Sequence, residues 1–244
     1  MISYGVIGSG RIGQRLMARL PGAVAVLTRS SILAEFFARK PAVVVECASA
    51  QALAEYGPAV LAAGIDLVPL SLTALADPAV EQRLMAAAAA GPGRIEIAPG
   101  AIGTLDLLAT AREEGLRRVV YRQLKSPAMW KLTPAAGLAN LDAITGRTVF
   151  FRGSVREVAR RFPNNLNTSV GVALAGLGLD GTEAELVADP AISETAHELD
   201  VHAAPGNAVL RLGGRDVAPD GDPVDYTTFS LMRLLRRRTA RMAI

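Results

Sequence analysis

The stretch GVIGSGRIGQRL, residues 5–16, is the most informative indication of the fold. Gly8, Gly10 and Gly13 have the spacing G-x-G-x-x-G, directly after an apolar run and at the start of a helical pattern. In such a turn the first glycine allows the sharp bend, the second lets the backbone approach a pyrophosphate, and the third allows close helix–strand packing. The stretch predicts a dinucleotide-binding turn; the alternative is a glycine-rich turn with a structural role only. The expected cofactor contacts here are Gly8, Gly10, Arg11, Ile12 and Gly13.

Short apolar runs and helical patterns alternate through the first hundred residues around this turn. Strands are expected over 2–8, 23–29, 42–49, 65–71 and 94–100, and helices over 11–20, 32–40, 51–64 and an alanine-rich stretch that ends near Gly91. Strands that alternate with helices form a parallel sheet with helices on both faces. The pattern therefore predicts an α/β fold with a Rossmann-type, doubly wound parallel sheet.

The rhythm changes after residue 99, where strand patterns outnumber helical ones. Strands are expected over 117–125, 146–154, 183–190, 198–204 and 208–214, and helices over 104–115 and 167–181. This pattern predicts a second, mixed α/β domain. We expect a dinucleotide-binding domain over 1–99, a substrate and dimerisation domain over 100–213, and a C-terminal helix within 214–244 that packs back on the first domain.

Bulk properties exclude several classes of protein. The formal net charge is only +3, and the arginines near the C-terminus are interpreted as a solvated helix face, so no nucleic-acid partner is expected. No apolar run is long enough to cross a membrane, and no signal peptide is recognised. Cys47, the only cysteine, is expected to be a buried thiol. A chain without a cysteine pair suits a reducing compartment, so we expect a soluble cytoplasmic protein.

The ends of the strands predict where the cofactor lies and which cofactor it is. Sites that prefer NAD tend to place an acidic residue after the second strand, whereas this chain has Thr28, Arg29 and Ser30. Because Arg29 could pair with a 2′-phosphate, the sequence favours NADP over NAD. Ligands bind beyond the carboxyl ends of parallel strands, so further cofactor contacts are expected from Ala48, Ser49 and Ser71.

The chain holds two histidines, His197 and His202. In an extended strand, residues an odd number apart lie on opposite faces, so the two rings point opposite ways. On a helix a spacing of five residues is also unsuited to one metal ion. We therefore expect no metal site. His197 shares its face with Leu199 and Val201, which makes it an ionisable ring on an apolar face; the ordinary alternative is a core histidine bonded to a backbone carbonyl.

Several motifs occur in order after residue 98: PGAIGTLDLL at 99–108, LKSPAMW at 124–130, FPNNLNTSVGVALAGLGLDGTEAELVADP at 162–190, and HELDV at 197–201. Together with the glycine turn they resemble the L-aspartate dehydrogenase family. The resemblance covers most of the chain. It implies a homodimer, a nicotinamide cofactor, and NAD(P)-linked oxidation of L-aspartate to iminoaspartate, which gives oxaloacetate and ammonia and is reversible.

The resemblance also assigns roles to residues. The family's catalytic histidine corresponds to His197, and its cofactor contacts correspond to Ala101 in GAIG and Asn167 at the end of FPNNLN. A histidine is suited to this reaction because it titrates near neutral pH and can take a proton from the substrate amine. For the substrate carboxylates we name Lys125 and Asn164. A plain surface role is the alternative for Lys125.

Two other functions stay open at this point. One is an NAD(P)-dependent reductase of the same fold that acts on another amino or keto acid. The other is a dinucleotide-binding sensor without catalysis, in which replacement of His197 would change no activity.

Overall fold

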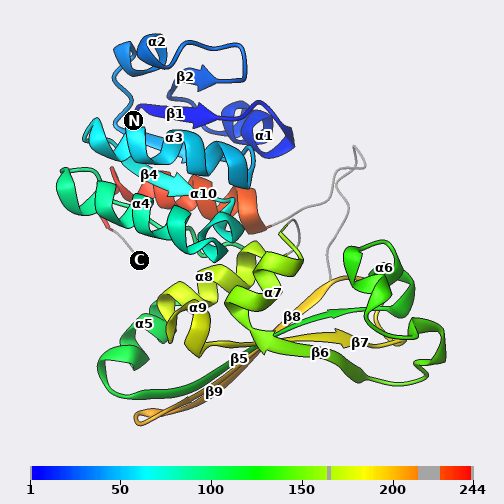
Figure 1. The fold of residues 1–244 in the computed structure, drawn as a ribbon. Helices are drawn as coiled ribbons and strands as arrows, with labels where there is room; N and C mark the ends of the chain where they lie inside the picture. The colour runs from blue at the N-terminus through cyan, green and yellow to red at the C-terminus, as the bar shows by residue number, and fades with distance from the viewer. Residues whose placement is uncertain (1, 164–165, 214–225, 243–244) are drawn as a thin grey trace. The chain divides into compact units, whose positions relative to one another are not determined.

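The structure, a computed structural model, describes residues 2–163, 166–213 and 226–242 (Figure 1). The chain divides into two units, Met1–Gly100 with Tyr226–Ile244, and Ala101–Asp225. We call them unit 1 and unit 2 and describe each by itself. Among the described residues, no helix is both long and apolar enough to cross a membrane.

Unit 1 contains a parallel sheet in the strand order β2-β1-β3-β4. The strands are β1 (Tyr4–Ile7), β2 (Ala23–Leu27), β3 (Val43–Glu46) and β4 (Asp66–Pro69). The helices are α1 (Arg11–Arg19), α2 (Leu33–Ala38), α3 (Ala50–Ala62), α4 (Pro78–Ala90) and α10 (Tyr226–Arg237), with a 3₁₀ turn, η1 (Leu72–Ala76). The predicted doubly wound parallel sheet is confirmed.

Both faces of this sheet are buried at β1 and β3, which explains why these two strands are almost entirely apolar, whereas β2 is largely exposed. On one face, Val6 and Val45 pack in a cluster with Leu16 of α1 and with Leu231 and Leu235 of α10. The other face lies against α3, which passes in front of the strands in Figure 1 and packs in turn against α4. The last helix of the chain thus completes the core of unit 1.

The strand expected over 94–100 is wrong, because only an isolated bridge forms there, between Leu67 and Ile95. Two backbone hydrogen bonds support it, from the Leu67 N–H to the Arg94 carbonyl and from the Glu96 N–H to the Leu67 carbonyl, both at 2.9 Å. Pro99 has no N–H with which to continue a ladder. The sheet of unit 1 therefore ends at β4.

The interpretation of the C-terminal arginines as a solvated face is wrong for Arg238 and holds only in part for Arg237, whose side chain is 38% exposed but ion-paired. The Arg238 side chain is only 14% exposed and donates to Asp66 at 2.7 Å and to Glu96. Arg237 donates to Glu96 at 3.1 Å. Burial alone would raise the pKa of Asp66, but the hydrogen bonds from Arg238 and the Arg94 N–H outweigh it and lower that pKa. These arginines tie the end of α10 to the amino end of β4.

Unit 2 contains a mixed sheet in the strand order β6-β7-β5-β8-β9. Its strands are β5 (Leu116–Lys125), β6 (Thr148–Ser154), β7 (Glu183–Ala188), β8 (Ala196–Ala203) and β9 (Gly206–Leu212). Its helices are α5 (Leu105–Glu113), α6 (Pro127–Lys131), α7 (Val155–Arg161), α8 (Asn167–Ala175) and α9 (Gly178–Gly181), with 3₁₀ turns η2 (Pro134–Gly137) and η3 (Leu141–Ala143). The predicted second α/β domain with a mixed sheet is confirmed, since only β5 and β7 pair in parallel.

The helices α5, α7, α8 and α9 lie together on one side of this sheet (Figure 1). A side chain added at Gly176, just after α8, would meet Val119 of β5 at 3.5 Å, so the helix-covered face is the one that carries Val119. Strand register places Tyr121 and Gln123 on the same face, with Gln123 directly opposite His197. The opposite face carries charged residues, including Arg122, which pairs with Glu185 at 2.5 Å.

Candidate functional site

The glycine turn of unit 1 is packed too closely for larger residues at two positions. Gly8 has φ +107°, a conformation that side chains disfavour, and an added Cβ would lie 2.8 Å from the Cβ of Ala48. A Cβ on Gly13 would lie 2.5 Å from the carbonyl oxygen of Gly8. The lack of a side chain at these two positions lets α1 lie close to the ends of β1 and β3, as a phosphate-binding turn requires.

Gly10 differs, because among the described residues no atom outside its chain neighbours lies within 4 Å of the position where its Cβ would stand. Its φ of −74° is open to any residue, and it is the residue that precedes α1. The protein's own packing therefore does not require glycine here. The open space at the N-terminus of α1 fits the close approach of a pyrophosphate to the main chain. The residues present at this turn thus fit a dinucleotide.

Beyond the carboxyl ends of β3 and β4, the predicted contacts Ala48, Ser49 and Ser71 are brought together by Glu46. The Glu46 carboxylate accepts hydrogen bonds from the N–H groups of Ala48, Ser49 and Ser71 and from the Ser71 hydroxyl. Glu46 was not anticipated from the sequence. The available signal was an acidic residue at the end of the apolar run VVVE, directly before a turn that contains Ser49.

At the end of β2, three hydroxyl groups surround the backbone next to Arg29. The Thr28 hydroxyl lies 3.2 Å from that of Ser30 and 3.0 Å from that of Ser31. The Thr28 N–H donates to the Ser31 hydroxyl at 2.9 Å. Arg29 is exposed. This turn therefore presents hydroxyl groups and a guanidinium, and no carboxylate, where a ribose would meet it.

In unit 2, His197 lies on the apolar face of β8, as the period-two pattern predicts. It is 7% exposed, while Leu199 and Val201 on the same face are 1% and 2% exposed. Its Nδ1 shares a hydrogen bond of 2.7 Å with the hydroxyl of Tyr121. Burial raises the pKa of Tyr121 far above its usual value, so the phenol stays protonated. Tyr121 therefore fixes the orientation of the His197 ring.

The two histidines differ as predicted. His202 points to the other face of β8, where its side chain is 42% exposed and its Nε2 lies 3.1 Å from Asp200. Within the described ranges, no group of three or more histidine, cysteine or acidic residues could hold a metal ion. Cys47 is partly buried, and burial raises the pKa of its thiol to about 12, so it is not a ready nucleophile.

The remaining predicted residues of unit 2 come from separate segments. Lys125 ends β5 and is buried at 8% exposure, with its Nζ 4.9 Å from the centre of the Trp130 ring. The surface alternative for Lys125 is therefore wrong. Asn167 is the first residue of α8, and Ala101 is the first residue of unit 2. Asn164 lies outside the described residues.

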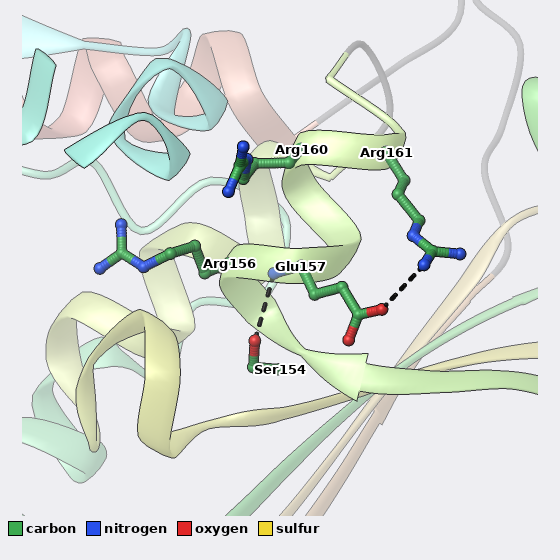
Figure 2. A pocket seen from close by; sticks show the side chains of 5 residues that line it. All are labelled: Ser154, Arg156, Glu157, Arg160 and Arg161. Atoms are coloured by element: carbon green, nitrogen blue, oxygen red, sulfur yellow. Dashed lines mark hydrogen bonds and ion pairs between the residues drawn. The ribbon is translucent and has the colours of Figure 1, made fainter. Parts of the chain in front are cut away.

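A surface cavity of about 490 Å³ lies along α7 and was not anticipated from the sequence. Figure 2 shows its lining residues, Ser154, Arg156, Glu157, Arg160 and Arg161. Two of the arginines meet carboxylates, since Arg156 pairs with Asp180 at 2.7 Å and Arg161 pairs with Glu157 at 3.1 Å. Much of the cavity's positive charge is thus balanced within unit 2.

Comparison with known proteins identifies the family. The family "Aspartate dehydrogenase, C-terminal" matches residues 106–238, more than half of the chain. The chain belongs to the aspartate dehydrogenase family. A second family, "Homoserine dehydrogenase, NAD binding domain", matches residues 13–98. Together with the glycine turn, this match makes unit 1 a nicotinamide-dinucleotide-binding domain.

Members of the aspartate dehydrogenase family resemble the chain along nearly its whole length. The L-aspartate dehydrogenase of Serratia proteamaculans is 37% identical over 251 aligned positions, which cover 95% of each chain. That of Ralstonia pickettii is 41% identical over 82% of this chain and 75% of its own. The crystal structure of aspartate dehydrogenase from Thermotoga maritima superposes with a TM-score of 0.79 at 26% identity and covers 100% of this chain and 99% of its own.

Proposed function

We propose that the protein catalyses the NAD(P)-dependent oxidation of L-aspartate to iminoaspartate, which hydrolyses to oxaloacetate and ammonia. The reaction is reversible as the reductive amination of oxaloacetate. The observation that carries the proposal is the likeness to L-aspartate dehydrogenases at 37% identity over 95% of both chains. The glycine turn, with its open space at Gly10, supports the cofactor half of the reaction.

His197 is the proposed catalytic residue. Hydride leaves the substrate Cα only while the amine is neutral, so a base must take the ammonium proton. Imidazole titrates in the required range. We assign proton transfer to Nε2, in the tautomer whose Nδ1–H donates to the hydroxyl oxygen of Tyr121, because an Nδ1 that accepted from Tyr121 would leave the proton on Nε2. After that proton is released to solvent, the same nitrogen would accept a proton from the water that attacks the imine. The nicotinamide ring, when bound, supplies the hydride acceptor.

The cofactor and substrate contacts extend this proposal to other residues. Gly8, Gly10, Arg11, Ile12 and Gly13 would hold the pyrophosphate, and Ala48, Ser49, Ser71, Ala101 and Asn167 would meet the nicotinamide half. Lys125 and Asn164 would bind the substrate carboxylates. For Lys125 the support is its position, because a buried ammonium attracts a carboxylate more strongly than an ammonium in bulk water does.

NADP is the preferred cofactor in this proposal. The 2′-phosphate would pair with the guanidinium of Arg29 and accept hydrogen bonds from the hydroxyls of Thr28 and Ser30. Support comes from the exposure of Arg29 and from the hydroxyl groups gathered at the end of β2. NAD remains the second cofactor, since nothing in this turn repels an unphosphorylated ribose.

The division of the chain into two units supports a proposed domain organisation. Residues 1–99 would bind the cofactor, residues 100–213 would bind the substrate and form a homodimer, and the helix of 214–244 would complete the first domain. The support for the last point is that α10 packs in the core of unit 1. We place the protein in the cytoplasm, because its single cysteine, Cys47, suits a reducing compartment.

A spectrophotometric screen tests the proposed function. Purified protein is mixed with L-aspartate and NADP⁺ or NAD⁺, and separately with oxaloacetate, ammonia and each reduced cofactor, while the absorbance of the reduced nicotinamide is followed. We expect turnover in both directions, with a higher kcat/KM for NADP⁺ than for NAD⁺. Silence with both substrates would exclude aspartate dehydrogenase activity, and a higher kcat/KM for NAD⁺ would exclude the assigned role of Arg29.

A further inference from the structure

We propose that Glu46 is a positioning residue for the nicotinamide dinucleotide: its buried carboxylate holds the turns after β3 and β4 in the conformation that binds the cofactor. Glu46 is 0% exposed. Its Oε1 accepts from the Ala48 N–H at 2.7 Å, the Ser49 N–H at 3.0 Å and the Ser71 hydroxyl at 2.9 Å. Its Oε2 accepts from the Ser71 N–H at 3.0 Å.

The chemistry of these contacts requires a carboxylate. Three of the four donors are backbone N–H groups, which cannot accept a hydrogen bond from the O–H of a protonated carboxyl group. The ionised form of Glu46 accepts from all four donors. Burial raises the pKa of Glu46, and the hydrogen bonds from Ala48, Ser71 and Ser49 oppose that shift. A buried charge costs free energy unless it is hydrogen-bonded in this way. The buried carboxylate of Glu46 is therefore stabilised only when both turns donate to it, and the same hydrogen bonds hold both turns in this conformation.

The position of Glu46 connects this cluster to the cofactor. Its strand, β3, pairs with β1 on one side and β4 on the other, so all three carboxyl ends meet at one edge of the sheet. Ligands of doubly wound sheets bind at that edge. Ala48 also lies against the glycine turn, since a Cβ on Gly8 would be 2.8 Å from its side chain. A shift of the turn after β3 would therefore disturb Gly8 as well.

The test is the variant Glu46→Gln. A glutamine amide has one acceptor oxygen, and in either orientation its NH₂ group faces at least one backbone N–H. We expect the dissociation constants of NADPH and NADH, measured by fluorescence titration without substrate, to rise about tenfold or more. In steady-state assays the KM for the cofactor should rise more than the KM for aspartate. Unchanged dissociation constants would overturn the proposal.

Asp66→Asn is the matched control. Asp66 is also a carboxylate that accepts a backbone hydrogen bond, from the Arg94 N–H at 3.0 Å, but it lies at the amino end of β4. We expect this variant to lower the melting temperature and leave cofactor affinity unchanged. An equal loss of affinity in both variants would show general destabilisation and would overturn the specific role of Glu46.

A second measurement applies if the Glu46→Gln protein fails to fold. In the wild-type protein, hydrogen–deuterium exchange at Ala48, Ser49 and Ser71 should slow together when NADPH or NADH is added. Slower exchange at the glycine turn alone would overturn the proposal. The inference rests on the cofactor half of the proposed function, and the fluorescence titrations and the exchange measurement both omit aspartate. A failure to oxidise aspartate would therefore leave their outcome unaffected.

Discussion

Replacing His197 with alanine is expected to lower kcat for aspartate oxidation about 10²–10⁴-fold, the usual contribution of a general base. The physical reason is that no other ionisable ring lies on the apolar face of β8, where His197 is held by Tyr121 at 2.7 Å. The cofactor dissociation constant should stay close to that of the wild type, because the glycine turn belongs to unit 1. The measurements are steady-state kinetics and a fluorescence titration of the same preparation.

His202→Ala is the matched control for this variant. The two histidines share one strand, but His202 faces the other side and is 42% exposed beside Asp200. The His202→Ala variant should have a kcat close to that of the wild type, as is usual for a substitution at the surface. Equal activity of the His197→Ala and wild-type proteins would contradict the catalytic role and favour the alternative of a core histidine.

Gly10→Val is expected to weaken cofactor binding strongly without unfolding the protein. Because no described atom outside the chain neighbours lies within 4 Å of the added Cβ and φ is −74°, the packing around Gly10 leaves room for a side chain. The same side chain would occupy the space that the pyrophosphate needs. The dissociation constant of NADPH should rise about 100-fold or more, a loss of roughly 3 kcal/mol. Thermal unfolding of the same preparation shows whether the fold survives.

Gly137→Val is the control for the glycine-turn variant. Gly137 also has open space around its Cβ position, but it lies in η2 of unit 2. We expect unchanged cofactor affinity. If Gly10→Val bound NADPH as tightly as the wild type, the cofactor would not approach the backbone at this turn, and the assignment of the turn would be wrong.

The elements of the fold were largely predictable because local patterns determine them. Runs such as VVVE at 43–46 must be buried on both faces, and they alternate with helical patterns, so a doubly wound sheet follows. The alternation of side chains along an extended strand correctly predicted that His197 lies on the apolar face of β8. The stretch over 94–100 was mistaken for a full strand because its apolar alternation does not reveal where backbone pairing stops.

The partners of the site residues were not predictable, because strand pairing brings them together over long separations. Tyr121 meets His197 across 76 positions, and Ser71 meets Glu46 across 25. No local pattern encodes either contact. For the same reason, no local pattern indicated that Arg238 pairs with Asp66, 172 positions away, instead of facing solvent.

The central claim is that the cofactor takes hydride directly from the Cα of L-aspartate. The most direct test is the oxidation of L-aspartate deuterated at Cα, with mass spectrometry of the reduced cofactor. The account predicts one deuterium in the nicotinamide ring of the NADPH formed and a slower rate when hydride transfer limits turnover. A reduced cofactor without deuterium, or no reduced cofactor at all, would contradict it.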